Sequence, residues 1–208
     1  LWISWGLRPQ ALIGQGIGEY VAACLAGTIH LEDVFRLVLL RGQLFEEISE
    51  IVGLSATSLA TAAHSTAITS LLDQCKTYLD RIPFATPRIP FLSEVTGTWI
   101  TPEQVIDPDY WVQHLRQPGS ITDLSSLFAT QEASVFLSLG PVPAEEILRA
   151  TDLFQTGSGH MALSSLPSQP KQGVEPVALL NAAGKLWLAG IELNWPAFYR
   201  AALPQRIT

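Results

Sequence analysis

Two side chains and one turn in this sequence have the chemistry and spacing of an acyl-transfer site. His64 could act as a base, and Arg41 offers the parallel N–H donors that suit a carboxylate. The segment Gly14–Tyr20 reads G-Q-G-I-G-E-Y. Its glycine spacing is that of the nucleophile elbow, where G-x-S-x-G exposes a serine at a helix N-terminus. Gly16 occupies the serine position, so this elbow has no nucleophilic atom.

The elements around the elbow are those that would position it. Ala11–Ile13 is an apolar segment typical of the end of a buried strand, and Val21–Ala26 indicates an apolar helix. Leu31–Val52 predicts a long helix with carboxylates in its first turn, and Arg41 falls on its apolar face. Ser65–Asp80 predicts a second amphipathic helix that begins directly after the histidine.

The remaining pattern alternates short strands with helices, so we expect an α/β domain with a short parallel sheet. The predicted elements are strands Phe91–Val95 and Val135–Leu139, helices Tyr110–Leu115, Thr122–Phe128, Pro143–Ala150 and Pro176–Ala189, and a loop over Ser164–Gly173. Arg41 and His64 are only 23 positions apart, which leaves no room for an inserted subdomain between them.

Composition excludes several classes of function. The net charge of −7 and the absence of a basic run argue against nucleic acid as a partner. No apolar run reaches the roughly 18 residues that a membrane span needs. His30, His114 and His160 are widely spaced, with no grouping with cysteine or carboxylate in the sequence, so no metal site is expected.

The elbow resembles that of the malonyl-type acyltransferase domains of modular polyketide synthases, which carry G-H-S-x-G-E-Y. Further segments resemble motifs of that family in the same order. They are Leu31–Asp33 with Leu40–Gly42 (L-E-D…R-G-R), Ala63–Ser65 (F-H-S), Ile89–Gly97 (I-P-x-x-S-N-V-T-G), Asp107–Arg116 (D-P-x-Y-W-x-x-H-x-R), Phe136–Pro141 (F-L-E-x-G-P) and the linker-like Leu186–Trp195.

The resemblance implies the large, hydrolase-like subdomain of these acyltransferases without the ferredoxin-like lid that the family inserts after the arginine helix. It implies vestigial catalytic positions at Gln15, Gly16 and His64, where the histidine either keeps a base role or only caps its helix. Arg41 matches the arginine that binds the malonyl carboxylate. In this chain it either keeps that role or pairs with an acidic side chain such as Glu19 or Glu94.

The resulting hypothesis is a catalytically inactive, acyltransferase-like adaptor domain of a polyketide synthase, with a core over residues 1–163 and a linker with a C-terminal helix over 164–208. The first alternative is an enzyme that transfers acyl or malonyl groups, or processes acyl-phosphopantetheine, with His64 and Arg41. The second is a docking platform for an acyl carrier protein or a separate acyltransferase. No cofactor is expected in the domain itself, although the parent synthase would use phosphopantetheine on a carrier protein. The resemblance implies a cytoplasmic protein beside other synthase domains, such as a GNAT-like domain or a carrier protein.

Overall fold

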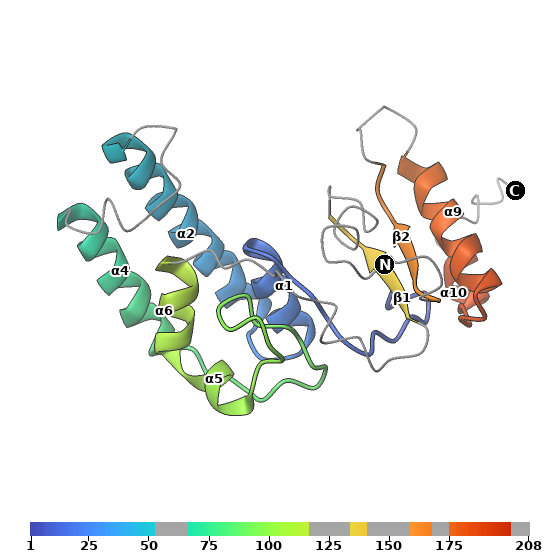
Figure 1. Ribbon diagram of the computed structural model, residues 1–208, viewed down its shortest axis with the longest axis horizontal. Coiled ribbons are helices and arrows are strands. Elements are labelled where there is room, and N and C mark those ends of the chain that lie inside the picture. The colour runs from blue at the N-terminus through green and yellow to red at the C-terminus, as the bar shows by residue number, and fades with distance from the viewer. Residues whose placement is uncertain (53–65, 117–133, 141–158, 168–174, 201–208) are drawn as a thin grey trace, which may run out of the picture. The chain divides into compact units, whose positions relative to one another are not determined.

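The computed structural model in Figure 1 describes residues 1–52, 66–116, 134–140, 159–167 and 175–200. Its elements in chain order are α1 (Ile17–Leu25), α2 (Leu31–Val52), α4 (Thr66–Leu79), α5 (Pro102–Ile106), α6 (Pro108–Arg116), β1 (Val135–Ser138), β2 (Met161–Ser164), α9 (Glu175–Leu188) and α10 (Trp195–Arg200). The chain forms two compact units. The elbow unit is Pro9–Ile121, and the strand unit combines Leu1–Arg8 with Thr122–Thr208.

The elbow unit is built on helices whose ends are encoded locally. α2 begins with two acidic residues in its first turn, as the sequence predicts, and these complement the positive end of the helix. α5 was not predicted, yet its start carries a complete capping box. The Thr101 hydroxyl accepts from the Gln104 N–H, the Gln104 side chain accepts from the Thr101 N–H, and Pro102 follows the cap.

The core of the elbow unit lies where α1, α2, α4 and α6 meet. Figure 1 shows α2 and α4 side by side, and their facing side chains Leu37, Leu44, Ile68 and Leu79 are fully buried. Trp111 of α6 is also fully buried, and its indole N–H donates to the Val105 carbonyl at 2.9 Å. This satisfied donor lets a large aromatic ring fill the core without leaving a polar atom unpaired.

The strand before the elbow is shorter than the sequence suggests. Leu12 forms one parallel bridge with Phe91, with its N–H donating to the Pro90 carbonyl at 2.9 Å. The strand predicted over Phe91–Val95 reduces to this bridge and an antiparallel bridge between Leu92 and Trp99. The chain turns after Ser93, whose carbonyl accepts from the Gly97 N–H at 2.9 Å, and the turn uses a positive φ of 68° at Gly97.

The strand unit contains the parallel sheet. β1 pairs with β2 in register from Val135 and Met161 to Ser138 and Ser164, and α9 packs on β2. β1 and α9 confirm the predicted strand Val135–Leu139 and helix Pro176–Ala189. β2 was missed because a four-residue strand without clear alternation carries little periodic signal. A second core gathers Trp2, Trp5 and Phe198 with residues of α9.

Several predictions fall outside the described residues, namely His64, the helices Thr122–Phe128 and Pro143–Ala150, and most of the loop Ser164–Gly173, of which β2 takes the first residue. The boundary between residues 163 and 164 stays a prediction. Among the described helices, none is both long and apolar enough to cross a membrane.

Candidate functional site

The elbow has the backbone conformation that its glycine pattern predicts. Gly16 is the N-cap of α1 and adopts φ 57° and ψ −117°, a strained conformation that residues other than glycine rarely adopt. Gly14 is required for a different reason. A Cβ atom there would lie 2.1 Å from the Gly18 carbonyl oxygen, so the two backbone segments can approach only if position 14 is glycine.

The position of the missing nucleophile has room for a side chain. A Cβ atom on Gly16 would have one neighbour within 4 Å, the Arg41 Nη2 atom at 3.6 Å. Gln15, the second altered position of the elbow, is exposed. The elbow therefore lacks its nucleophile because of the residue type at position 16, and not because the space has closed.

Two buried carboxylates stabilise the elbow by accepting hydrogen bonds from backbone N–H groups. The Gly16 N–H donates to Glu94 Oε2 at 2.7 Å, and the Glu94 N–H donates to Glu19 Oε2 at 2.8 Å. Glu19 and Glu94 are 0% and 3% exposed, so both groups depend on protein donors. Glu94 stands where the family motif S-N-V-T-G has asparagine. This difference puts a carboxyl group within hydrogen-bond distance of the Gly16 N–H.

His114 of α6 joins these carboxylates to Arg41. Its Nε2 atom lies 3.2 Å from Glu94 Oε2 and 3.4 Å from Glu19 Oε2. Its Nδ1 atom lies 3.3 Å from Arg41 Nη1 and 3.1 Å from the Tyr20 hydroxyl. An arginine can only donate, so Nδ1 must accept, and the ring proton is assigned to Nε2, between the carboxylates.

The partner of Arg41 differs from the sequence expectation. Arg41 is 5% exposed, but neither Glu19 nor Glu94 pairs with it, because both are directed at His114 Nε2. Among the described residues no carboxylate lies within 4.0 Å of its guanidinium. The group instead bonds to His114 and lies 5.8 Å and 5.2 Å from the ring centroids of Tyr20 and Phe45. Cation–π contacts and a ring nitrogen thus replace the expected ion pair.

Tyr110 completes the hydrogen bonding of Glu19. Its hydroxyl donates to Glu19 Oε1 and lies 2.6 Å from Ser93 Oγ. Burial raises the pKa of Glu19, although His114 and the Tyr110 hydrogen bond act in the opposite direction. Burial also raises the pKa of the Tyr110 and Tyr20 hydroxyls, so both remain protonated donors. We call the six residues Glu19, Tyr20, Arg41, Glu94, Tyr110 and His114 the elbow cluster.

Three members of the elbow cluster have the chemistry of cation ligands. The ligand atoms of Glu19, Glu94 and His114 lie within 4.8 Å of one another, a grouping that the spacing of the histidines in the sequence does not indicate. The hydrogen bond from Arg41 nevertheless determines which ring nitrogen of His114 carries the proton. Its donation to Nδ1 keeps the proton on Nε2, the atom that would have to bind a cation. The three residues therefore form a hydrogen-bonded network rather than an open metal site.

Sequence reasoning located part of this arrangement. Arg41 lies beside Gly16 as expected, whereas His64 is outside the described residues. The sequence did not indicate the roles of His114 and Tyr110, which lie one helical turn apart on α6. The resemblance of Asp107–Arg116 to an acyltransferase motif indicated that this segment matters. It did not indicate which residues contact His114.

Comparison with known proteins finds relatives among polyketide synthases. No family model matches the chain. Polyketide synthase GfsB from Streptomyces halstedii is 26% identical over an alignment of 265 positions that covers the whole chain and 5% of the synthase. The PKS-NRPS hybrid synthetase ATPKS from Aspergillus niger is 25% identical over 100% of the chain and 15% of the synthetase.

Solved structures define the fold. The acyl transferase domain of ZmaA superimposes with a TM-score of 0.74 and 26% identity, covering 100% of this chain and 60% of that one. The acyltransferase domain from the second module of the salinomycin polyketide synthase gives a TM-score of 0.72 at 24% identity, with 61% of that chain covered. The chain therefore has the fold of polyketide synthase acyltransferase domains and is similar to them over its full length. It spans about 60% of those solved chains.

Proposed function

We propose that this chain is the acyltransferase-like region of a polyketide synthase, that it does not transfer acyl groups, and that it serves as a structural adaptor. The observation that carries the proposal is Gly16 at the nucleophile position of an otherwise well-formed elbow. Covalent acyl transfer needs an oxygen or sulfur nucleophile activated by a base. Removing the nucleophile from a serine hydrolase site lowers kcat by roughly 10⁶-fold.

The absence of the lid subdomain is part of the same proposal. The alignment with GfsB runs over 265 positions, 57 more than the 208 residues of the chain, so the synthase contains segments that this chain does not. The short spacing between Arg41 and His64 is where the family's lid would be inserted. Without a lid, water would reach an acyl intermediate, and a site for acyl transfer has to exclude it.

Exposed apolar side chains on two helices support an adaptor role. Ile17, Val21 and Leu25 follow one another at four-residue spacing on α1, and each is at least 40% exposed. Leu31, Phe35 and Leu39 repeat the pattern on α2, and each is at least 54% exposed. Contiguous apolar surface of this kind usually marks a contact with another protein segment. Neighbouring synthase domains, including a GNAT-like domain or a carrier protein, are the partners that we propose.

One observation favours a second candidate function. Arg41 is buried without a carboxylate partner among the described residues, and its Nη2 atom faces the vacant side-chain position of Gly16. A ligand carboxylate could supply the missing negative charge. This would fit noncovalent binding of malonyl groups, or processing of acyl-phosphopantetheine with His64 as the base. A docking platform for a carrier protein or a separate acyltransferase would use the same open space.

Intact-protein mass spectrometry tests the proposal. After incubation with malonyl-CoA or acetyl-CoA, the purified protein should keep its mass, because residue 16 has no side-chain oxygen. The free thiol of Cys24 is only partly buried, so the Cys24→Ser variant controls for direct thiol acylation by the thioester. An adduct that persists in Cys24→Ser and disappears on prior unfolding would contradict the proposal that the domain is inactive.

A further inference from the structure

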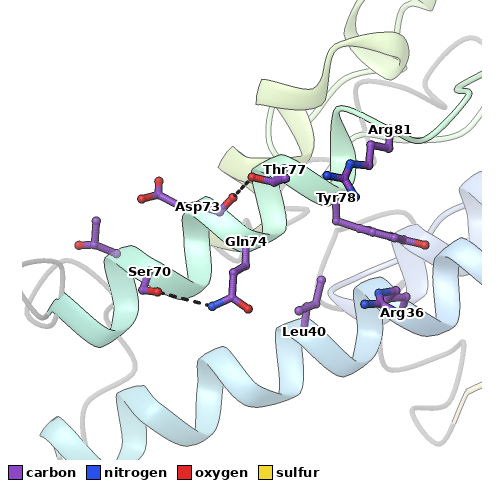
Figure 2. Close-up of a pocket in the computed structure, with 9 residues that line it drawn as sticks. Arg36, Leu40, Ser70, Asp73, Gln74, Thr77, Tyr78 and Arg81 are labelled. Atoms are coloured by element: carbon purple, nitrogen blue, oxygen red, sulfur yellow. Dashed lines mark hydrogen bonds between the residues drawn. The ribbon is translucent and has the colours of Figure 1, made fainter.

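A groove on the elbow unit, separate from the elbow cluster, has the features of an anion site. It lies between α2 and α4, encloses about 640 Å³ and is shown in Figure 2. A volume of this size is within the range that small-molecule sites occupy. The groove and the elbow cluster have no residue in common, so this inference does not rest on the proposed function.

Positive charge is concentrated at one end of the groove. Arg36 of α2 and Arg81, which follows α4, lie at this end on either side of Tyr78 (Figure 2). Within the described part of the chain, ion pairs join Lys76 to Asp109 and His114 to Glu19 and Glu94, and neither groove arginine takes part in one. Two guanidinium groups without acidic partners therefore face one space, in a protein whose net charge is −7.

Tyr78 fixes the geometry of this end. The Arg36 Cζ atom lies 5.2 Å from the centre of the Tyr78 ring, and the Tyr78 hydroxyl donates to Asp33 Oδ1 at 2.6 Å. Burial and this hydrogen bond raise the pKa of Tyr78 to about 12, so the hydroxyl stays neutral beside an anion. Stacking on the ring limits the motion of the Arg36 side chain and leaves its N–H donors available.

The rest of the groove offers neutral polar groups. Ser70 and Gln74 line it along α4, and their side chains contact each other at 3.5 Å. From Ser70 to Tyr78 the helix rises about 12 Å, so the groove is elongated. Asp73 is the one acidic lining residue, and it is exposed. A ligand that fits would have an anionic head at the arginine end and a polar tail along α4.

We propose that this groove binds a small molecule carrying a phosphate monoester, with the phosphate between Arg36 and Arg81 and the polar remainder along Ser70 and Gln74. A phosphate fits better than a carboxylate because its three terminal oxygens can serve two guanidinium groups, one from α2 and one from the turn after α4. A carboxylate has two oxygens and is satisfied by one bidentate arginine. The proposal concerns a small ligand rather than a peptide or a nucleic acid.

Two-dimensional ¹H–¹⁵N NMR titration of the protein with inorganic phosphate, propyl phosphate and butyrate tests this inference. Saturable shifts are expected for amides of α4 and of α2 near Arg36, and propyl phosphate should bind at least fivefold more tightly than butyrate. Arg36→Gln and Arg81→Gln should each raise the dissociation constant at least fivefold. Asp73→Asn should lower it, because the variant removes a repelling charge.

The control is Arg88→Gln, which removes an exposed positive charge from the same unit outside the groove. This variant should bind phosphate as the original protein does. Shifts that do not saturate, or an equal loss of binding in Arg88→Gln, would show only general attraction of anions and would overturn the proposal. Butyrate binding as tightly as propyl phosphate would overturn the assignment of phosphate.

Discussion

The elbow cluster and the groove between α2 and α4 both contain arginine from α2, but they use it in opposite ways. Arg41 is 5% exposed, and its neighbours His114, Tyr20 and Phe45 all come from the same unit. Arg36, five residues earlier, is exposed and has no acidic partner among the described residues. Little more than one turn of a single helix thus separates a charge enclosed by the fold from a charge available to a ligand.

This difference shows how a buried network of polar side chains can serve the structure of the fold. The elbow cluster has two carboxylates, a histidine and one buried guanidinium whose polar groups bond mainly to one another. Buried polar groups that are satisfied in this way specify one arrangement of the helices that carry them. In the groove, Leu40 and Tyr78 pack against the core, whereas Arg36, Asp73 and Arg81 are exposed.

The largest expected effect is on stability when Arg41 is removed. Arg41→Ala should lower the free energy of unfolding by about 3 kcal/mol, because it removes a buried side chain together with its hydrogen bond to His114 and its cation–π contacts with Tyr20 and Phe45. Arg36→Ala, the matched change in the groove, should cost at most about 0.5 kcal/mol. Urea denaturation followed by circular dichroism measures both. Similar losses in the two variants would show that the comparison between the two regions is wrong.

A smaller loss is expected when Glu94 loses its charge but keeps its size. The amide of Glu94→Gln can still accept from the Gly16 N–H through its oxygen. The same oxygen keeps the bond from the His114 ring N–H, because both bonds go to Oε2. The cost of about 1–3 kcal/mol comes from the buried NH₂ group that replaces Oε1 and from the loss of the charge. Asp73→Asn in the groove should change stability by at most about 0.5 kcal/mol. Equal midpoints in urea for Glu94→Gln and the original protein would contradict the network described here.

The sequence predicted the backbone of this region better than its side-chain partners. The elbow, α2, α4, α6 and α9 follow from glycine spacing, apolar periodicity and acidic first turns, which are local signals. The pairing of Arg41 with His114 could not be predicted, because it joins residues 73 positions apart in the sequence. Glu94 was recognised as a possible partner, but the choice between Arg41 and His114 depends on packing that only the folded chain defines.

A third effect is a dependence of stability on pH. The pKa of Glu19 is raised by burial, so the folded protein binds this proton more tightly than the unfolded chain does. Its contribution is fully present below the unfolded value of 4.5 and is lost as pH rises through the folded pKa. The slope cannot exceed about 1.4 kcal/mol per pH unit. The titratable groups from other elements that act on Glu19 are Glu94, Tyr110 and His114.

Glu19→Gln tests this dependence. Urea denaturation between pH 4 and pH 8 should give a flatter profile for Glu19→Gln than for the original protein. The exposed carboxylate Glu46 provides the control, since Glu46→Gln should leave the profile unchanged. If Glu19→Gln retained the full slope, another group would be responsible, and Glu19 would not bind the proton that the fold stabilises.

The smallest expected effect is a gain of activity when the elbow motif is restored by Gln15→His with Gly16→Ser. The serine fits, because its Cβ would have only Arg41 Nη2 within 4 Å, although its φ of 57° costs about 1 kcal/mol of strain. Its nearest polar neighbour is then a guanidinium, which can donate but cannot remove the serine proton. Acyl transfer to a carrier protein should therefore stay near background.

The assay follows loading of the carrier protein by mass spectrometry. Transfer at about 1 per second or faster, within the ordinary range of enzymes, would show that only the two elbow residues were missing. The proposed loss of the lid would then have no catalytic consequence.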